Sequence, residues 1–458
     1  MAKVIVIMCD TLRRDALGCY GDKWIHTPFF DRLAELACIF DNAYISAFPT
    51  IPNRTDLFVG KYTFPFHGWQ ALSRDETPVA ACLTDAGVVT QFIHDTMHML
   101  NSGSFFARGF QGWKAIRGGE SDAFENLANV EIALPCPDEH YRGDGRAARQ
   151  YLRNRHHWSK ESDWFVAQTA NECCTWLERN YKAKDFFLWI DTFQIHEPWD
   201  PPQWYIDRYD PGFKGPVNIH PRYDYCDYLT KRELKAAVAR YAGEVTLTDR
   251  WIGNVIQKVE DLGIDDETVI MLTSDHGMYL GEHGRIGKHT VLDPSDPWPL
   301  YDTVAKIPWI VRMPGMKKAK RIKGLVQPPD MMPTLLDLFG VRGRRDLHGR
   351  SLLPLIKGKA RQIRKAAFSG GQMTGAEGML HTPITVSSAD GWTLVFGHPT
   401  DPPELYHTAK DPAQKKNVIG AYAAKARRLY DTFEQFLIEV HAPEEAVERC
   451  RSRVPGKA

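Results

Sequence analysis

Residues 3–11 read Lys-Val-Ile-Val-Ile-Met-Cys-Asp-Thr, an unbroken apolar run that ends in a carboxylate. A continuous run of this length, rich in β-branched residues, is typical of a strand buried on both faces of a parallel sheet. Residues 88–93, 185–190 and 268–273 follow the same pattern. Segments with helical periodicity separate these runs. The chain is therefore predicted to be an α/β protein with a large, mostly parallel central sheet between helices.

Boundary signals mark the expected helices. Thr27-Pro28 is a typical helix start, and Gly263 ends a long amphipathic helix whose apolar residues begin at Tyr241. Residues 101–165 and 198–230 are irregular, and we expect long excursions there, the first covering one face of the sheet. Further helices are expected at 79–86, 164–181 and 331–339, and further strands at 40–45 and 307–312.

The pattern changes near residue 362. Short strands are expected at 365–369, 384–388 and 393–397, followed by a helix over 420–440. The sequence thus predicts a catalytic domain over residues 1–362 and a small C-terminal α+β domain over residues 363–458. The last fifteen residues are expected to be loose.

Segment 48–60 reads Phe-Pro-Thr-Ile-Pro-Asn-Arg-Thr-Asp-Leu-Phe-Val-Gly and is predicted to hold a helix that starts at Thr50 and stops at Gly60. A helix start offers free N–H groups, and the guanidinium of Arg54 offers a fork of donors within the first turn. This segment can therefore bind an anion. A loop leading into a core helix is the alternative interpretation.

Ionisable side chains follow all four predicted buried strands. The carboxyl ends of parallel strands share one edge of a sheet, which is where ligands bind in open α/β proteins. Capping explains one such residue, but four together favour a polar site at this edge. The residues are Asp10, His94-Asp95, Asp191 with His196, and Asp275-His276.

Asp10, Asp275 and His276 form a plausible divalent-metal set. Two carboxylates and an imidazole suit manganese, zinc or iron better than calcium, which takes oxygen ligands. A metal beside Thr50 would lower the pKa of its hydroxyl, which is otherwise a poor nucleophile. Thr50 is therefore a candidate metal ligand as well as a nucleophile. Arg54, His196 and Lys288 would supply charge or donors to a transferring anionic group.

Composition limits the partners. The 458 residues contain 57 Lys+Arg and 57 Asp+Glu, so the formal net charge is zero. This argues against nucleic acid or an anionic membrane as a partner, but it does not exclude a local basic pocket. No apolar stretch reaches the roughly 18 residues of a membrane span, and the N-terminus has no signal-peptide pattern. The nine scattered cysteines suit a reduced cytoplasm, and a homo-oligomer is an open alternative.

Several motifs occur in a fixed order along the chain: Thr27-Pro-Phe-Phe-Asp-Arg-Leu33, Thr50-Ile-Pro-Asn-Arg54, His196-Glu-Pro198, Ser274-Asp-His-Gly277, Leu280-Gly-Glu-His-Gly284 and Gly287-Lys288. In these the chain resembles the sulfatase branch of the alkaline phosphatase superfamily, with arylsulfatases and phosphonate monoester hydrolases as relatives. The resemblance implies an alkaline-phosphatase-like sandwich fold and metal-dependent hydrolysis of an anionic ester. It also implies that position 50 is the nucleophile.

The departures from the family pattern bear on the chemistry. Sulfatases convert a Cys or Ser at the nucleophile position to formylglycine, whose hydrate has two hydroxyls, whereas Thr50 has one. His276 stands where calcium-dependent sulfatases usually have Asn, which points to manganese or zinc. Thr11 stands where many relatives carry a further Asp or Gln ligand. The roles of Thr11, Asp95, His98 and His289 stay open.

The missing second hydroxyl favours phosphorus over sulfur. A phosphorylated Thr50 can be released by water attacking phosphorus, whereas a sulfated Thr50 would need attack at sulfur. We therefore expect a hydrolase of phosphodiesters, phosphomonoesters or phosphonate esters that works through a covalent intermediate on Thr50. A sulfatase is the first alternative. A phospho-transferase or an inactive binding homologue is the second.

Overall fold

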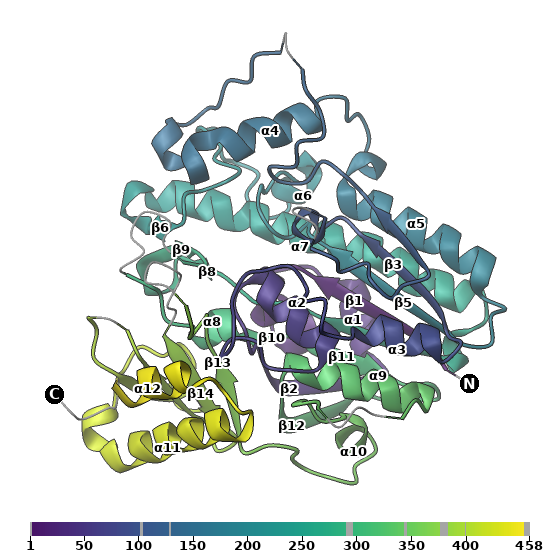
Figure 1. Cartoon of the computed structure of the whole chain (residues 1–458). Helices are drawn as coiled ribbons and strands as arrows, with labels where there is room; N and C mark the ends of the chain where they lie inside the picture. Colours follow the sequence, from purple (N-terminus) through teal and green to yellow (C-terminus); the bar gives the residue numbers. More distant parts are fainter. Residues whose placement is uncertain are drawn as a thin grey trace.

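The structure is a computed structural model of the whole chain (Figure 1), and it describes residues 2–100, 104–127, 130–289, 296–342, 346–375, 383–398 and 400–452. Within these ranges no helix combines the length and the apolar character needed to cross a bilayer.

A large sheet runs through the middle of the molecule. Within the described residues it has nine strands in the order β10-β2-β11-β7-β1-β5-β3-β4, and β12 pairs with β2 outside this path. The strands are β1 (Lys3–Cys9), β2 (Cys38–Tyr44), β3 (Val89–His94), β4 (Gly112–Ala115), β5 (Phe186–Thr192), β7 (Thr268–Thr273), β10 (Lys306–Ile307), β11 (Trp309–Arg312) and β12 (Lys320–Val326).

Four neighbouring strands in the centre carry the expected polar ends. β7, β1, β5 and β3 are parallel, and Met8 of β1 lies opposite Thr273 on one side and Asp191 on the other. β10 and β11 pair antiparallel with β2, and β11 pairs antiparallel with β7. The sheet is thus mostly parallel, and the four carboxyl ends meet at one edge.

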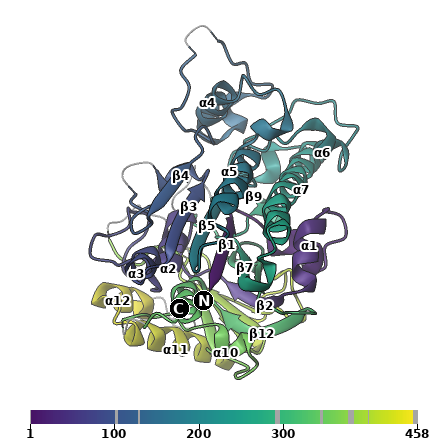
Figure 2. The same cartoon turned by 90° about the vertical axis from the view of Figure 1, so that its right-hand side faces the viewer.

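Helices cover both faces of the sheet (Figure 2). Along β1, Val4, Val6 and Met8 pack on one core and Ile5, Ile7 and Cys9 pack on the other, as the two-residue repeat of a strand requires. The first core includes residues of α2 (Thr50–Val59), α3 (Val79–Asp85) and α9 (Met331–Phe339), and the second includes residues of α1 (Pro28–Glu35), α5 (Phe165–Asn180) and α7 (Lys231–Asp261). The predicted α/β sandwich is confirmed.

The structure adds to the sequence prediction at α7 and departs from it in the first excursion. α7 begins ten residues earlier than its apolar pattern, because Thr230 and Glu233 form a capping box at its start. The excursion over 101–165 contains β4, which pairs with β3 at the sheet edge, so this part extends the sheet instead of covering it. The excursions also contain α4 (Arg146–Asn154) and α6 (Gln203–Asp207).

A small antiparallel sheet forms the C-terminal part, as predicted. Its strands are β13 (Ala366–Ser369), β14 (Ile384–Ser388), β15 (Trp392–Phe396) and β16 (Glu404–His407), and α11 (Ala423–Glu439) packs on them. Residues 444–452 form α12 (Glu444–Ser452) instead of the expected loose tail, because Ala446 and Cys450 are buried in the same core. Residues 453–458 lie outside the described residues. The domain boundary at residue 362 stays a prediction.

The remaining elements are short. β6 (Asp224–Tyr225), β8 (Tyr279–Leu280) and β9 (Arg285–Gly287) form a three-stranded sheet next to the long α7, while α8 (Asp302–Ala305) and α10 (Leu353–Ile356) are single helical turns. β9 matters for function because it leads directly to Lys288.

Candidate active site

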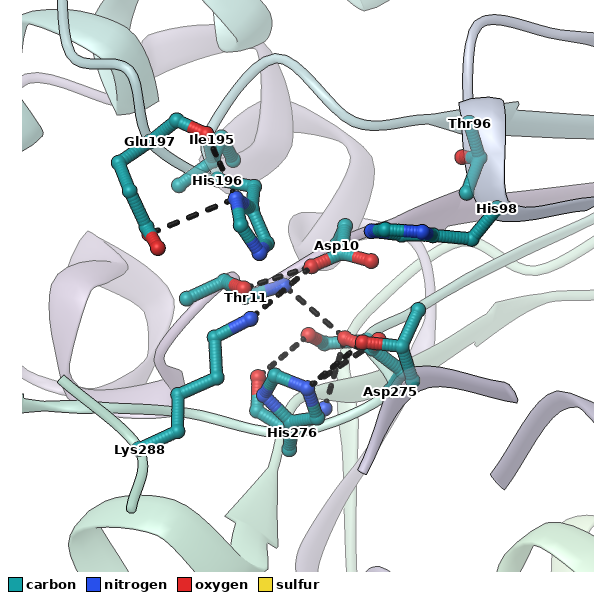
Figure 3. A network of polar contacts seen from close by, with 12 residues as sticks. Asp10, Thr11, Thr96, His98, Ile195, His196, Glu197, Asp275, His276 and Lys288 are labelled. Atoms are coloured by element: carbon teal, nitrogen blue, oxygen red, sulfur yellow. Dashed lines mark hydrogen bonds and ion pairs between the residues drawn. The ribbon is translucent and has the colours of Figure 1, made fainter. Parts of the chain in front are cut away.

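Asp10, His196, Asp275, His276 and Lys288 lie together at the carboxyl edge of the sheet (Figure 3). The contacts of Thr50 with His276 and of Arg54 with Asp275 place these two residues there as well. Asp10 follows β1, Asp275 and His276 follow β7, and Thr50 is the first residue of α2, as predicted. Every residue of α2 is buried, so this helix holds the Thr50 hydroxyl in a fixed place. The exposed fractions of Thr50, Arg54, His196 and Lys288 are all 4% or less.

Asp10, Asp275 and His276 are arranged to hold a cation. One ligand atom from each lies within 4.8 Å of the others. His276 Nδ1 lies 2.9 Å from the Gly277 carbonyl oxygen and so donates its N–H to it. In the neutral ring, Nε2 is therefore unprotonated and carries a lone pair. His276 Nε2 lies 3.4 Å from Asp275 Oδ2 and 3.3 Å from Thr50 Oγ1. An imidazole with its N–H on a carbonyl and its lone pair facing oxygens is typical of a metal ligand.

The balance of charge points the same way. Burial, followed by the neighbouring Asp275, raises the pKa of the Asp10 carboxyl, while burial and then Lys288 lower the pKa of His276 well below its ordinary value. Asp10 Oδ2 is buried and accepts no hydrogen bond. Among the residues that the structure describes, three buried carboxylates, from Asp10, Asp191 and Asp275, face two cations, Arg54 and Lys288. A divalent metal ion held by Asp10, Asp275 and His276 would turn this excess of negative charge into a positive charge, which suits an anionic group.

Arg54 lies beneath the cluster and ties it together. Its Nη1 donates to Asp275 Oδ2 at 2.6 Å, its Nη2 to Asp191 Oδ1 at 2.7 Å, and its Nη2 lies 3.0 Å from Asp10 Oδ2. Burial works against the charge on Arg54, but these carboxylates outweigh burial and raise its pKa well above its ordinary value. Because its donors point at carboxylates, the geometry gives Arg54 a positioning role. Its predicted contact with the transferred group stays a prediction.

Thr11 links the two metal-site carboxylates. Its Oγ1 donates to Asp10 Oδ1 at 2.6 Å, and its N–H donates to Asp275 Oδ1 at 2.9 Å. Its φ of 59° lies in the left-handed region, which is strained for a β-branched residue. Tyr241 of α7 stabilises this conformation, since its hydroxyl donates to the Thr11 carbonyl and accepts from the Arg13 N–H, both at 3.0 Å.

Lys288 and His196 face the same cluster. Lys288 Nζ lies 3.9 Å from Asp10 Oδ1 and extends toward it in Figure 3. His196 follows β5, and its ring stacks on Phe193 with the ring centres 4.0 Å apart. Their predicted contact with a transferring anionic group stays a prediction.

Sequence reasoning gave no role to two contributors, Asp191 and Asn53. Asp191 was noted only as a strand end, yet it binds Arg54 and accepts from Thr96 Oγ1 at 2.6 Å. Asn53 donates to the Asp275 carbonyl at 2.7 Å. Asp191 lies opposite Met8 on the neighbouring strand. Because tertiary structure sets the register of that pairing, the sequence alone could not show that Asp191 reaches Arg54.

Asp95, His98 and His289 are residues for which the sequence left the role undecided. Asp95 is buried and accepts from Thr169 Oγ1, Thr192 Oγ1 and the Phe193 N–H, so it holds the turn after β5. His98 is partly exposed, and its Nε2 lies 3.1 Å from Glu120 Oε2. The ring of His289 lies 5.6 Å from that of Tyr223.

The comparisons with known proteins agree with this geometry. The sequence model of the sulfatase family matches residues 2–341, and that of the C-terminal part of N-sulphoglucosamine sulphohydrolase matches residues 282–442. An arylsulfatase of Clostridium perfringens (strain 13 / Type A) is 26% identical over 469 residues, which cover 93% of this chain and 91% of that protein.

Two solved structures show the same fold. The phosphonate monoester hydrolase SpPMH of Silicibacter pomeroyi has a TM-score of 0.74 at 23% identity, over 96% of each chain. A protein solved in complex with its substrate D-glucosamine-2-N,6-O-disulfate has a TM-score of 0.71 at 20% identity, over 97% of this chain and 99% of that one. With the family match over residues 2–341, the chain belongs to the sulfatase family of ester hydrolases in the alkaline phosphatase superfamily.

Proposed function

We propose that the chain is a metal-dependent hydrolase of phosphoesters or phosphonate esters that uses Thr50 as its nucleophile. The observation that carries this proposal is the position of Thr50 Oγ1, 3.3 Å from His276 Nε2 at the start of a fully buried helix. No other hydroxyl among the described residues of the chain combines the helix start with a direct contact to the Asp10, Asp275 and His276 cluster.

Asp10, Asp275 and His276 would hold the metal, with Thr50 as a further ligand. When bound, a divalent metal ion lowers the pKa of a neighbouring hydroxyl and neutralises charge on the transferring group. Thr50 Oγ attacks phosphorus in line and gives its proton to solvent. Lys288 and the first N–H groups of α2 stabilise the negative oxygens, because both present positive charge to them.

His196 serves the leaving group in this mechanism. Its Nε2 takes up a proton from solvent and passes it to the departing oxygen as the P–O bond breaks, which leaves the phosphoryl group on Thr50. Water then attacks phosphorus, returns a proton to His196, and restores the Thr50 hydroxyl, which regains its proton from solvent. A single hydroxyl is enough for this cycle.

Sulfate ester hydrolysis is the second candidate, and the family match together with the arylsulfatase relative favours it. Its difficulty is chemical, because Thr50 lacks the second hydroxyl that lets a formylglycine hydrate expel sulfate. We therefore rank sulfate esters below phosphorus esters.

A panel of nitrophenyl phosphate monoesters, phosphate diesters, phosphonates and sulfates, each with manganese, zinc or calcium, tests the proposal. Turnover is expected for a phosphorus ester with manganese or zinc, and Thr50→Val should lower it by a factor on the order of 10⁴ to 10⁶. Thr50→Ser, which keeps one hydroxyl, should retain measurable turnover. Turnover of sulfate alone, or full activity in Thr50→Val, would overturn the proposal. Product formed only with an acceptor alcohol would mark a transferase, and full metal loading without any turnover would mark a binding protein.

A cytoplasmic location stays a prediction.

A further inference from the structure

We propose that Glu197 is a positioning residue that fixes His196 and supports a positive charge on its ring during departure of the leaving group. This inference rests on the proposed function, in which His196 carries a proton to the departing oxygen. Glu197 follows His196 directly in the chain, and in Figure 3 its carboxylate points at the His196 ring.

The contacts of His196 fix its tautomer. Nδ1 lies 2.7 Å from the main-chain oxygen of Glu197 and 3.4 Å from its carboxylate atom Oε2. Both partners are acceptors, so Nδ1 must carry a proton. In the neutral ring, Nε2 is then unprotonated and carries a lone pair. It is protonated only when the ring becomes an imidazolium.

The Glu197 carboxylate is held by one oxygen and left open at the other. The Tyr223 hydroxyl donates to Oε1, while Arg142 Nη1 and His220 Nε2 lie 3.5 Å and 3.8 Å from the same atom. Oε2 is buried and accepts no hydrogen bond. An unsatisfied buried carboxylate oxygen is costly to the fold, so its place 3.4 Å from an imidazole nitrogen indicates a role for it there.

Burial and nearby positive charges disfavour the protonated form of His196, so a protonated ring needs a carboxylate beside it. Burial, followed by the charge of Lys288, lowers the pKa of His196 well below its ordinary value, and Arg142 acts in the same direction. Burial raises the pKa of Glu197, while Lys288 and Arg142 oppose that rise and favour its charged form. Glu120, which Arg142 also binds at 2.8 Å, acts in the opposite direction and raises the pKa of His196, as does the hydrogen bond to the Glu197 carbonyl. A charged Glu197 is the group that contacts the ring directly and favours its protonated state.

The arrangement resembles other carboxylate–imidazole pairs, in which the carboxylate holds the ring and stabilises the imidazolium that forms. Here the carboxylate belongs to the next residue in the chain. Phe193 covers one face of the His196 ring, so the ring cannot rotate freely. Glu197 therefore acts through His196 and needs no contact with substrate.

The first test varies the leaving group on one transferred group. In Glu197→Gln, kcat for esters of poorly acidic alcohols should fall by about 100-fold, because these alcohols need a proton to leave. Turnover of the nitrophenyl ester, whose leaving group needs no proton, should stay within about threefold of wild type. Added to His196→Gln, the Glu197→Gln change should have no further effect. Equal losses on all esters, or additive effects in the double variant, would overturn the inference.

The matched control is Glu244→Gln. Glu244 is also fully buried, but it accepts from Gln194 Nε2 and the Asp200 N–H and makes no described contact with His196. It should lower turnover of all esters equally, if at all. A loss confined to poorly acidic alcohols in Glu244→Gln would show that any buried carboxylate change has this effect, and would overturn the assignment to Glu197.

The second test needs no turnover, so it separates this inference from the proposed function. In the zinc-loaded, ¹⁵N-histidine-labelled protein, the His196 signals are identified by their loss in His196→Gln. Wild type should show the Nδ1–H tautomer, and Glu197→Gln should move the His196 titration to lower pH. An unmoved titration would refute the role of Glu197 even in an active enzyme. A moved titration in a protein without esterase activity would refute the proposed function and leave the pairing intact.

Discussion

His276 Nε2 lies 3.3 Å from Thr50 Oγ1, although 226 residues separate the two in sequence. The contact joins the end of β7 to the first turn of α2. It brings the candidate metal ligands and the proposed nucleophile together.

Arg54 should be essential for stability as well as for activity. Arg54→Lys removes the planar fork that binds Asp191 and Asp275 and leaves buried carboxylates without full compensation. We expect the free energy of unfolding of the metal-free protein to fall by about 3–5 kcal/mol, measured by urea denaturation. The matched control Arg32→Lys alters a partly exposed pair with Glu260 and should cost less than about 1 kcal/mol. Equal effects for the two variants would contradict the role given to Arg54.

Tyr241 should tune metal affinity from a distance. Tyr241→Phe removes the hydroxyl that stabilises the left-handed conformation of Thr11, which in turn orients Asp10 and Asp275. Manganese or zinc affinity, measured by calorimetric titration, should weaken by about tenfold. Tyr209→Phe removes another buried hydroxyl that contacts α7, the one bonded to Thr246, and should leave affinity unchanged. The same loss in both variants would indicate a general effect of weakening contacts to α7.

Asp249 should make stability depend on pH. Its carboxyl accepts from the Phe29 and Phe30 N–H groups at the start of α1, and burial raises its pKa to about 8. The folded state therefore holds a proton that the unfolded state loses near pH 4, so the Asp249 contribution is present below about pH 4 and is lost as pH rises to about 8. Asp249→Asn should remove a fall of up to about 1.4 kcal/mol per pH unit within this window. Urea denaturation at several pH values measures it, and a pH profile identical to wild type would contradict the prediction.

Converting position 50 to the sulfatase nucleophile should change the preferred ester. Thr50→Cys, produced together with an enzyme that oxidises such a cysteine to formylglycine, gains the hydrate with two hydroxyls. Aryl sulfate turnover should then rise relative to wild type while the metal site stays intact. A protein whose conversion is verified by mass but whose sulfate turnover does not rise would show that the one-hydroxyl argument is not what separates sulfur from phosphorus here.

The sequence was informative where chemistry follows directly from local pattern. Buried strands that end in Asp10 and in Asp275-His276 were readable, since a short apolar run followed by ionisable residues predicts a strand end at a ligand site. The start of α2 at Thr50 was readable from its Pro and Gly signals. The family motifs then assigned these positions their expected roles.

What the sequence could not predict depends on register and packing between distant segments. Asp191 reaches Arg54 because β5 pairs with β1 in one particular register. Tyr241 reaches Thr11 because α7 packs on the same core as Ile5 and Ile7 of β1, and nothing in the sequence distinguishes its hydroxyl from that of a core tyrosine. α12 was missed although Ala446 and Cys450 stand four residues apart, which is the spacing of one helix face.

The most direct test of the central claim is mass spectrometry of the wild-type protein, quenched during turnover of a phosphate or phosphonate ester and digested. We expect a covalent phosphorus adduct on the peptide that contains Thr50, present with manganese or zinc and absent in Thr50→Val. Steady turnover with no adduct on Thr50 at any quench time, together with an active Thr50→Val variant, would contradict it.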